Sequence, residues 1–292
     1  MDPRARRAGW RPLPPRGTPG RRRGGGVRTI DLTLPLYPFM PVGNVWAWDS
    51  PFQLAPIMTP DSHGVSAYDM SFHSETGTRL MLAACYADDA PKIDELDYAR
   101  LVNRPAVVID IPKGALEAIM PEDIDATLAV DPDVRPGDAV LVRTGWGDGE
   151  RYRRLGDEYA TTTPHFSVAG AERLVEVMRE KDLDLMLTDC AYVGGHGKGL
   201  QYPEWSSRRP WDRPPFPSDQ ARIYMRHYVG SRGAGGTGPD FPASVPLHAS
   251  VSPVAALANC GSVTAKRITV TVLPLYLAGA AGAPCTVVAM EE

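Results

Sequence analysis

The chain has 292 residues, a hydrophobic fraction of 43%, a charged fraction of 23% and a net charge of −4, which is typical of a globular protein with one large or two small domains. Residues 1–28 hold nine arginines and one aspartate, so the remainder carries 22 basic and 34 acidic residues. A folded body this acidic is a poor candidate for nucleic-acid binding. No apolar run reaches the length of about 18 residues that a membrane-spanning helix needs.

The four cysteines are widely spaced and form no C-x-x-C pair; they are Cys85, Cys190, Cys260 and Cys285. This pattern argues against a disulfide framework and against a structural zinc site. It fits a reducing compartment, and we predict a cytoplasmic protein.

The first 26 residues are mainly Arg, Pro and Gly, with almost nothing to bury. We predict a disordered leader over residues 1–26, without the apolar segment of a secretion signal. Residues 27–292 are predicted to form a single α/β domain. After the first predicted strand, a loop rich in Pro and Gly contains the aromatic residues Trp46, Trp48 and Phe52. Aromatic side chains in such a loop either line a pocket or cover the edge of a core.

The stretch Tyr68–Asp94 is the main candidate for a site. It begins with the period-two alternation of a strand, turns at residues 76–78, and continues as an apolar run from Leu80 to Tyr86. Titratable groups gather around the turn, namely His73, Glu75, Arg79 and Cys85. We interpret this as a functional site; the alternative is an ordinary hairpin with exposed polar ends.

Strands and helices alternate through the rest of the chain, which indicates an α/β domain with a mixed sheet. The clearest helix is 167–181, with Ser167 as N-cap. Strands are predicted at 106–111, 139–144, 183–187, 268–273 and 285–290, and further helices at 93–102, 121–125 and 250–260.

Asp189 follows the strand 183–187, at a position where α/β sheets tend to face ligands. Tyr192 and His196 come next, in a Gly-rich run that lacks P-loop spacing. Residues 193–245 then show little periodicity, and so long a segment is typical of a lid, an oligomer arm or disorder. Asp189 can form an acid/base pair with His196 or His248 if the fold brings them together.

Four segments resemble the cyclase family that includes bacterial kynurenine formamidase and isatin hydrolase, over about residues 28–290. They are R-T-I-D-L-T-L-P-L-Y-P-F-M-P from Arg28, G-D-A-V-L-V-R-T-G-W from Gly137, Phe166–Asp189 and Arg267–Ala289. The resemblance implies a mixed sheet of the swivelling β/β/α type with flanking helices and a long irregular insertion. It also implies a homo-oligomer, because members of this family typically are.

The family carries its chemistry in H-x-G-T-H-x-D-x-P-x-H, whose first two His and Asp bind a divalent metal and whose last His is catalytic. Gly77-Thr78 matches the G-T. The other motif positions then fall on Glu75, Arg79, Met81, Ala83 and Cys85. A guanidinium cannot be a metal ligand, and a thioether is unsuited to a hard metal.

The resemblance also implies a later pair of ligands, a His and a Glu about twelve residues on. His248 matches the His, but Cys260 falls at the Glu, with Asn259 beside it. Glu75 and His248 are too few for a family-like centre of three or four ligands. We therefore expect no bound metal, and a divalent ion such as zinc or manganese is the alternative.

The substitutions have a chemical interpretation. Arg79 places a fixed positive charge near the former metal position, where it can hold a carboxylate or stabilise an oxyanion. Glu75 can pair with it or act as general base. Because Arg cannot activate water as a metal does, cyclisation, dehydration and isomerisation become more plausible than hydrolysis.

The predicted catalytic residues are His248, Glu75, Arg79, Asp189 and His73, and the predicted substrate-binding residues are Trp46, Trp48, Tyr192, His196 and Cys85. His73 is either an acid/base or a structural histidine. Cys85, which replaces the family's catalytic His, is either a nucleophile beside a His or cation or a small core residue.

Three functions remain open. The first is a metal-independent cyclase-family enzyme that acts on a small cyclic or aromatic molecule, in the specialised metabolism of a bacterium with a GC-rich genome. The second is a metal-dependent amide or lactone hydrolase with Glu75, Asp189, His196 and His248 as ligands. The third is a non-catalytic binding protein on the same fold.

Overall fold

The computed structural model describes residues 26–43, 51–85, 90–194 and 251–292. The predicted leader and nearly all of the 193–245 insertion lie outside these ranges. Within the described ranges, no helix has both the length and the apolar character needed to span a bilayer.

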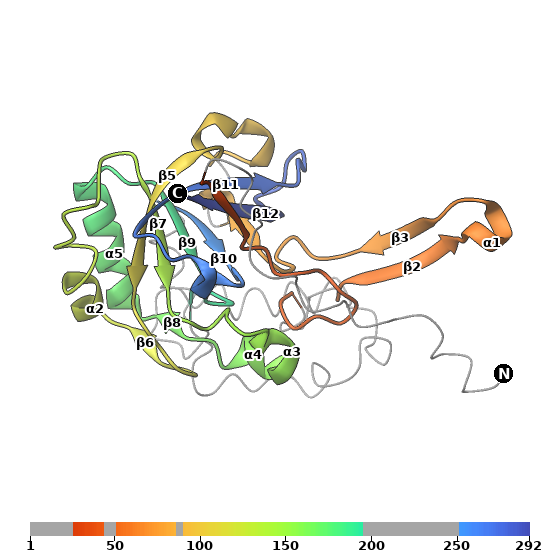
Figure 1. Cartoon of the computed structure of the whole chain (residues 1–292), viewed down its shortest axis with the longest axis horizontal. Helices are drawn as coiled ribbons and strands as arrows, with labels where there is room; N and C mark the ends of the chain where they lie inside the picture. Colours follow the sequence, from red (N-terminus) through yellow and green to blue (C-terminus); the bar gives the residue numbers. More distant parts are fainter. Residues whose placement is uncertain (1–25, 44–50, 86–89, 195–250) are drawn as a thin grey trace.

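The main sheet has eight strands in the order β1-β12-β11-β5-β7-β9-β10-β4, and β4 pairs again with β12. This extra pairing closes the sheet into a barrel-like arrangement (Figure 1). The strands are β1 (Arg28–Asp31), β4 (Arg79–Met81), β5 (Arg104–Asp110), β7 (Ala139–Arg143), β9 (Leu185–Thr188), β10 (Ser252–Ala255), β11 (Arg267–Pro274) and β12 (Gly282–Glu291).

Two small sheets and five α-helices complete the described fold. The small sheets pair β2 (Gln53–Met58) with β3 (Ala67–Ser71), and β6 (Ala118–Ile119) with β8 (His165–Phe166). The helices are α1 (Pro60–His63), α2 (Pro121–Asp125), α3 (Arg151–Leu155), α4 (Asp157–Thr161) and α5 (Val168–Glu180), and short 3-10 turns lie at Ala83–Cys85, Ile93–Glu95, Tyr98–Arg100 and Cys260–Ser262.

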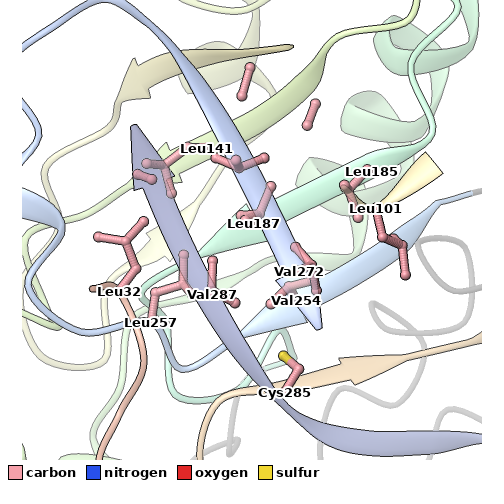
Figure 2. Close-up of a cluster of buried hydrophobic side chains, with 14 of the residues drawn as sticks. Leu32, Leu101, Leu141, Leu185, Leu187, Val254, Leu257, Val272, Cys285 and Val287 are labelled. Atoms are coloured by element: carbon pink, nitrogen blue, oxygen red, sulfur yellow. The ribbon is translucent and has the colours of Figure 1, made fainter. Parts of the chain in front are cut away.

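Two apolar clusters sandwich the strands. Alternate residues of β5, such as Ala106 and Val108, belong to the inner cluster, while Val107 and Ile109 belong to the outer one. Figure 2 shows the inner cluster, to which distant strands contribute Leu141, Leu187 and Val272 among others. Because both faces of these strands are buried, their sequences read as continuous apolar runs.

Helix α5 covers the outer cluster, as its sequence predicts. Its buried residues include Leu174, Val177 and Met178, which contribute to that cluster. The Ser167 side chain accepts a hydrogen bond from the Gly170 N–H at 2.9 Å, so the predicted N-cap is confirmed.

The predicted helix at 250–260 is wrong. Residues 252–255 form β10, which pairs in parallel with β9 and antiparallel with β4. Positive φ angles at Ala256 and Asn259 then separate β10 from the 3-10 turn at Cys260–Ser262. The Ala content favours a helix locally, but the pairing of β10 with two distant strands overrides that propensity.

Two further elements differ from prediction. The segment 93–102 forms two separate 3-10 turns instead of one helix, because Leu96 and Asp97 between them are extended. The apolar run from Leu80 is a strand only as far as Met81 and then turns at Ala83–Cys85. The strand predicted before the turn exists as β3, but its partner is β2 and not β4, so the two halves of that stretch belong to different sheets.

Candidate active site

Strand β4 places Arg79 at the closure of the sheet. Arg79 lies opposite Ala255 of β10 on one side and Pro284 of β12 on the other. Its neighbour Leu80 belongs to the inner core cluster, so the Arg79 side chain projects from the opposite face of the strand. It is nevertheless only 1% exposed.

The Arg79 guanidinium is held by backbone carbonyls and an aromatic ring. Nη1 donates to Ala191 O at 2.9 Å and to Gly77 O at 3.3 Å. The guanidinium carbon lies 4.6 Å from the centre of the Tyr192 ring, within the range of a cation–π contact. Within the described part of the chain, Nε has no hydrogen-bond partner and no carboxylate pairs with the guanidinium.

The turn before β4 is fixed by its own polar groups. His73 Nδ1 accepts from the Glu75 N–H at 3.2 Å, and Thr76 Oγ1 accepts from the His73 N–H at 3.1 Å. Thr78 Oγ1 accepts from Leu34 N–H and donates to Ala256 O, both at 2.7 Å. Gly77 has a φ of 68°, which favours glycine. His73 therefore has a structural contact, and its acid/base role stays a prediction.

The charges of Glu75 and Arg79 both act on the Cys85 thiol. Burial raises the pKa of the half-buried Cys85 thiol to about 11; the Glu75 charge adds to this, while a backbone hydrogen bond and Arg79 oppose it. The thiol donates to Ala281 O at 3.4 Å. A thiol with this pKa is neutral near pH 7, which favours the small-core-residue interpretation over a nucleophile.

Asp189 lies at the carboxyl end of β9, beside the end of β7, and is 0% exposed. Its oxygens accept from Thr144 N–H at 2.8 Å, Thr144 Oγ1 at 2.7 Å, Gly145 N–H at 2.8 Å and Gly147 N–H at 3.2 Å. Burial raises the pKa of Asp189, and the hydrogen bonds from Thr144 oppose that rise. These hydrogen bonds show that the carboxylate holds the backbone of residues 144–147 in place. Its acid/base role stays a prediction.

The Asp189 contacts also position the groups around Arg79. Ala191 and Tyr192, which contact the guanidinium, follow Asp189 after one intervening residue, Cys190. The Tyr192 hydroxyl accepts from Gly43 N–H at 3.2 Å, and Tyr192 is buried. The structure thus brings the predicted residues Arg79 and Tyr192 together, with Asp189 anchoring the segment between them.

An aromatic cluster next to this site was missed by the sequence reasoning. Trp146 stacks on Tyr159 with ring centres 5.9 Å apart, and Tyr152 meets Tyr159 edge-on at 6.2 Å. These rings share a core cluster with Tyr192 and Phe52, so Phe52 covers a core edge. The sequence feature that could have indicated this cluster is the Gly145-Trp146-Gly147 run, which follows a predicted strand. Trp46, Trp48, His196 and His248 lie outside the described residues.

The described donor set does not fit a family-like metal centre. Arg79 presents only N–H donors, and Met81 offers a thioether on the same short strand. Both Asp189 oxygens are already taken by N–H and O–H donors. In the ranges that the structure covers, no three His, Cys, Asp or Glu side chains gather closely enough to hold an ion.

Comparison with known proteins gives the following likenesses. Residues 30–193 match the family described as Putative cyclase. Isatin hydrolase A from Labrenzia aggregata, bound to benzyl benzoate, is 23% identical with a TM-score of 0.65, over 90% of this chain and 93% of that one. Isatin hydrolase A from Ralstonia solanacearum is 20% identical with a TM-score of 0.64, over 91% and 92%.

A third structure, the predicted metal-dependent hydrolase from Bacillus stearothermophilus, is 16% identical with a TM-score of 0.59, over 92% of this chain and 100% of that one. No curated protein sequence matches. At these identities the structural likeness establishes the fold.

We predict that Asp189→Asn destabilises the protein by roughly 3 kcal/mol, because an amide brings donors against the N–H groups that the carboxylate now satisfies. Urea unfolding measures the change. The control is Asp110→Asn at the end of strand β5, where the carboxylate is 58% exposed and pairs with Arg143; the stability lost in this variant should stay below about 1 kcal/mol. Equal stability of both variants would contradict the structural role.

We also predict that the Cys85 thiol reacts slowly with iodoacetamide at pH 7, about a hundredfold slower than a thiol of ordinary pKa near 8.5. Its rate should rise with pH towards a midpoint near the pKa of about 11. Mass spectrometry of the native protein follows the labelling, and Cys85→Ser is the control, since the other three cysteines are buried. Rapid labelling at pH 7 would restore Cys85 as a nucleophile.

Proposed function

This chain belongs to the putative cyclase family, and we propose that it is an enzyme of that family whose site is rebuilt around Arg79 and works without a divalent metal. One observation carries the proposal: the guanidinium of Arg79, which the resemblance aligns with a metal ligand of the family, is buried with no described carboxylate beside it. Burying an uncompensated charge is costly, so a negative ligand would be favoured there.

The hydrogen bonds of Arg79 support an anionic substrate. Nη1 is committed to the two backbone carbonyls. Nε is unpartnered among the described residues, and no described group accepts from Nη2. Nε and Nη2 form one side of the guanidinium fork, which matches the two oxygens of a carboxylate. The geometry thus favours a small carboxylate-bearing molecule.

The surroundings favour a cyclic or aromatic substrate. Tyr192 lies against the guanidinium, and Trp146, Tyr152 and Tyr159 belong to the same apolar cluster. Aromatic side chains pack well against rings, and the proposed ring would lie beside Tyr192, because Trp146, Tyr152 and Tyr159 are buried against one another. Trp46, Trp48, His196 and Cys85 remain proposed binding residues.

In the proposed chemistry, Arg79 stabilises negative charge that develops on a substrate oxygen. Glu75, which is half-buried at the turn before β4, takes a proton from the substrate and returns it at another position or to a leaving hydroxyl group. His248 and His73 are the other proposed acid/base groups. Isomerisation, dehydration and cyclisation all need only these steps, and we propose this group of reactions over hydrolysis.

We predict that benzoate binds the full-length protein and that its neutral isostere benzamide binds at least about tenfold more weakly, because only the carboxylate pairs with Arg79. Isothermal titration calorimetry measures both ligands. Arg79→Ala should lower the affinity for benzoate about tenfold to a hundredfold. Arg79→Lys should keep part of that affinity, because lysine retains the charge but lacks the two parallel donors of the guanidinium.

The control variant for this experiment is Arg173→Ala, on the exposed face of α5, where the guanidinium pairs with Asp125 and Glu176. It should bind benzoate as the wild type does. Equal binding of benzoate and benzamide would contradict the carboxylate site. Benzoate binding without turnover of any cyclic carboxylate would instead favour a non-catalytic binding protein.

We further predict less than about 0.1 divalent metal ion per chain in the purified, untagged protein, because the described residues at the ligand positions cannot form a site of three or four ligands. Elemental mass spectrometry measures the content, and benzoate binding should be unchanged by a chelator. Near-stoichiometric zinc or manganese would contradict the proposal and favour a metal-dependent amide or lactone hydrolase that uses Glu75, Asp189, His196 and His248.

A further inference from the structure

Arg151, the first residue of helix α3, is a second arginine without a carboxylate partner. The other half-buried arginines of the described chain each pair with a carboxylate; they are Arg28, Arg104, Arg143, Arg153, Arg173 and Arg267. Among the arginines of the described ranges that are not exposed, only Arg79 and Arg151 lack such a partner. A cation that is partly removed from water without a counter-charge is costly, so both side chains are expected to meet negative groups.

The carboxylates nearest to Arg151 in the sequence are bound to other groups. Asp148 Oδ1 accepts a hydrogen bond from the Gly261 N–H at 2.7 Å. Glu150 Oε1 lies 3.8 Å from Nη1 of Arg153. The acidic residues around the start of α3 therefore leave the charge of Arg151 uncompensated.

The indole ring of Trp146 holds the Arg151 side chain. The guanidinium carbon lies 4.7 Å from the centre of the ring, within the range of a cation–π contact. The ring is itself fixed, because Trp146 Nε1 donates to Tyr159 O at 3.0 Å and the two rings stack. A cation–π contact uses the charge of the guanidinium but none of its N–H donors, and in the described part of the chain these donors have no acceptor.

Arg79 and Arg151 lie at the same edge of the main sheet. Strands β7, β9 and β10 are parallel and end at this edge. Strand β4 runs antiparallel to β10, so its first residue, Arg79, lies opposite Ala255 at the end of β10. Helix α3 follows the end of β7, and the turn between them is held by Asp189, which accepts from the Gly147 N–H. Ligands of α/β sheets bind beyond the carboxyl ends of the strands, which is where both arginines stand.

The charge of Arg151 also acts on the interior of this edge. Burial raises the pKa of the Tyr159 hydroxyl well above its usual range, the charge of Asp189 adds to the rise, and the charge of Arg151 opposes it. The guanidinium of Arg151 is therefore close enough to the end of β9 to influence groups beside Asp189.

We propose that Arg151 binds a second carboxylate of the molecule whose first carboxylate pairs with Arg79, so that the site takes a small cyclic dicarboxylate. This inference rests on the proposed function and narrows its substrate class. The donors of a guanidinium match the two oxygens of a carboxylate, and two fixed cations favour a ligand with two negative charges over one with a single charge. Arg151 is then a specificity-determining residue.

Isothermal titration calorimetry of the full-length protein tests the proposal with dicarboxylates of graded spacing. The probes are phthalate, isophthalate, terephthalate and a biphenyl with a carboxylate at each end, each compared with its monomethyl ester, which has a similar shape but one charge fewer. We expect the wild type to bind at least one dicarboxylate about tenfold more tightly than its ester. Arg151→Ala should reduce this preference to about twofold or less, and Arg151→Lys should keep part of it, because lysine retains the charge.

The control variant is Arg154→Ala, which removes the same charge from an exposed position on the same helix. It should keep the preference for the dicarboxylate, and circular dichroism confirms that all variants are folded. An equal loss of preference in Arg154→Ala and Arg151→Ala would show a general effect of charge and overturn the proposal. A wild type that binds benzoate but prefers no dicarboxylate would overturn the second carboxylate site alone, whereas a wild type that does not bind benzoate would overturn the proposed function as well.

Discussion

The short strand β4 closes the sheet, and the candidate site depends on that closure. Its three residues pair with β10 on one side and with β12 on the other, so the backbone around Arg79 has little freedom. Thr78, just before the strand, ties the turn to Leu34 and Ala256. A long side chain on such a backbone is positioned by the sheet itself, which is what a site built on a rigid element requires.

The second constraint is the Asp189 carboxylate. By accepting four hydrogen bonds from the segment after β7, it fixes the ends of two parallel strands relative to each other. The chain then continues through Ala191 and Tyr192, which hold the guanidinium. In the candidate site, a buried carboxylate and a buried guanidinium therefore have separate roles: the first orders the backbone, and the second carries the charge.

This arrangement suggests how a family fold can change its chemistry. In the proposed function, Arg79 at the start of β4 replaces a metal ligand, and the strand positions the arginine as it would position the ligand. An arginine at such a position supplies a permanent positive charge with directional donors, but it supplies no activated water. The proposed shift from hydrolysis towards proton transfer follows from that difference, and the rigid surroundings need not change for it to occur.

The sequence by itself determined much of the fold. The strands β5, β7 and β9 and helix α5 were predicted correctly, because an apolar run or a 3.6-residue period reflects burial that each segment carries locally. The turn at residues 76–78 placed Glu75, Arg79 and Cys85 near one another for the same local reason. The aromatic neighbours Trp146, Tyr152 and Tyr159 could not be assigned to the site, since their contacts join separate segments.

Only the tertiary structure decided which strands pair. Residues 252–255 have helical propensity but become β10, because β9 and β4 lie on either side of them. Likewise β3 joins β2, and β4 closes the main sheet. The burial of Arg79 could not be predicted either, because the sequence around it does not distinguish an exposed arginine from one that is enclosed by Ala191 and Tyr192. Local sequence determined which elements and titratable groups exist, whereas long-range hydrogen bonds and packing decided how they meet.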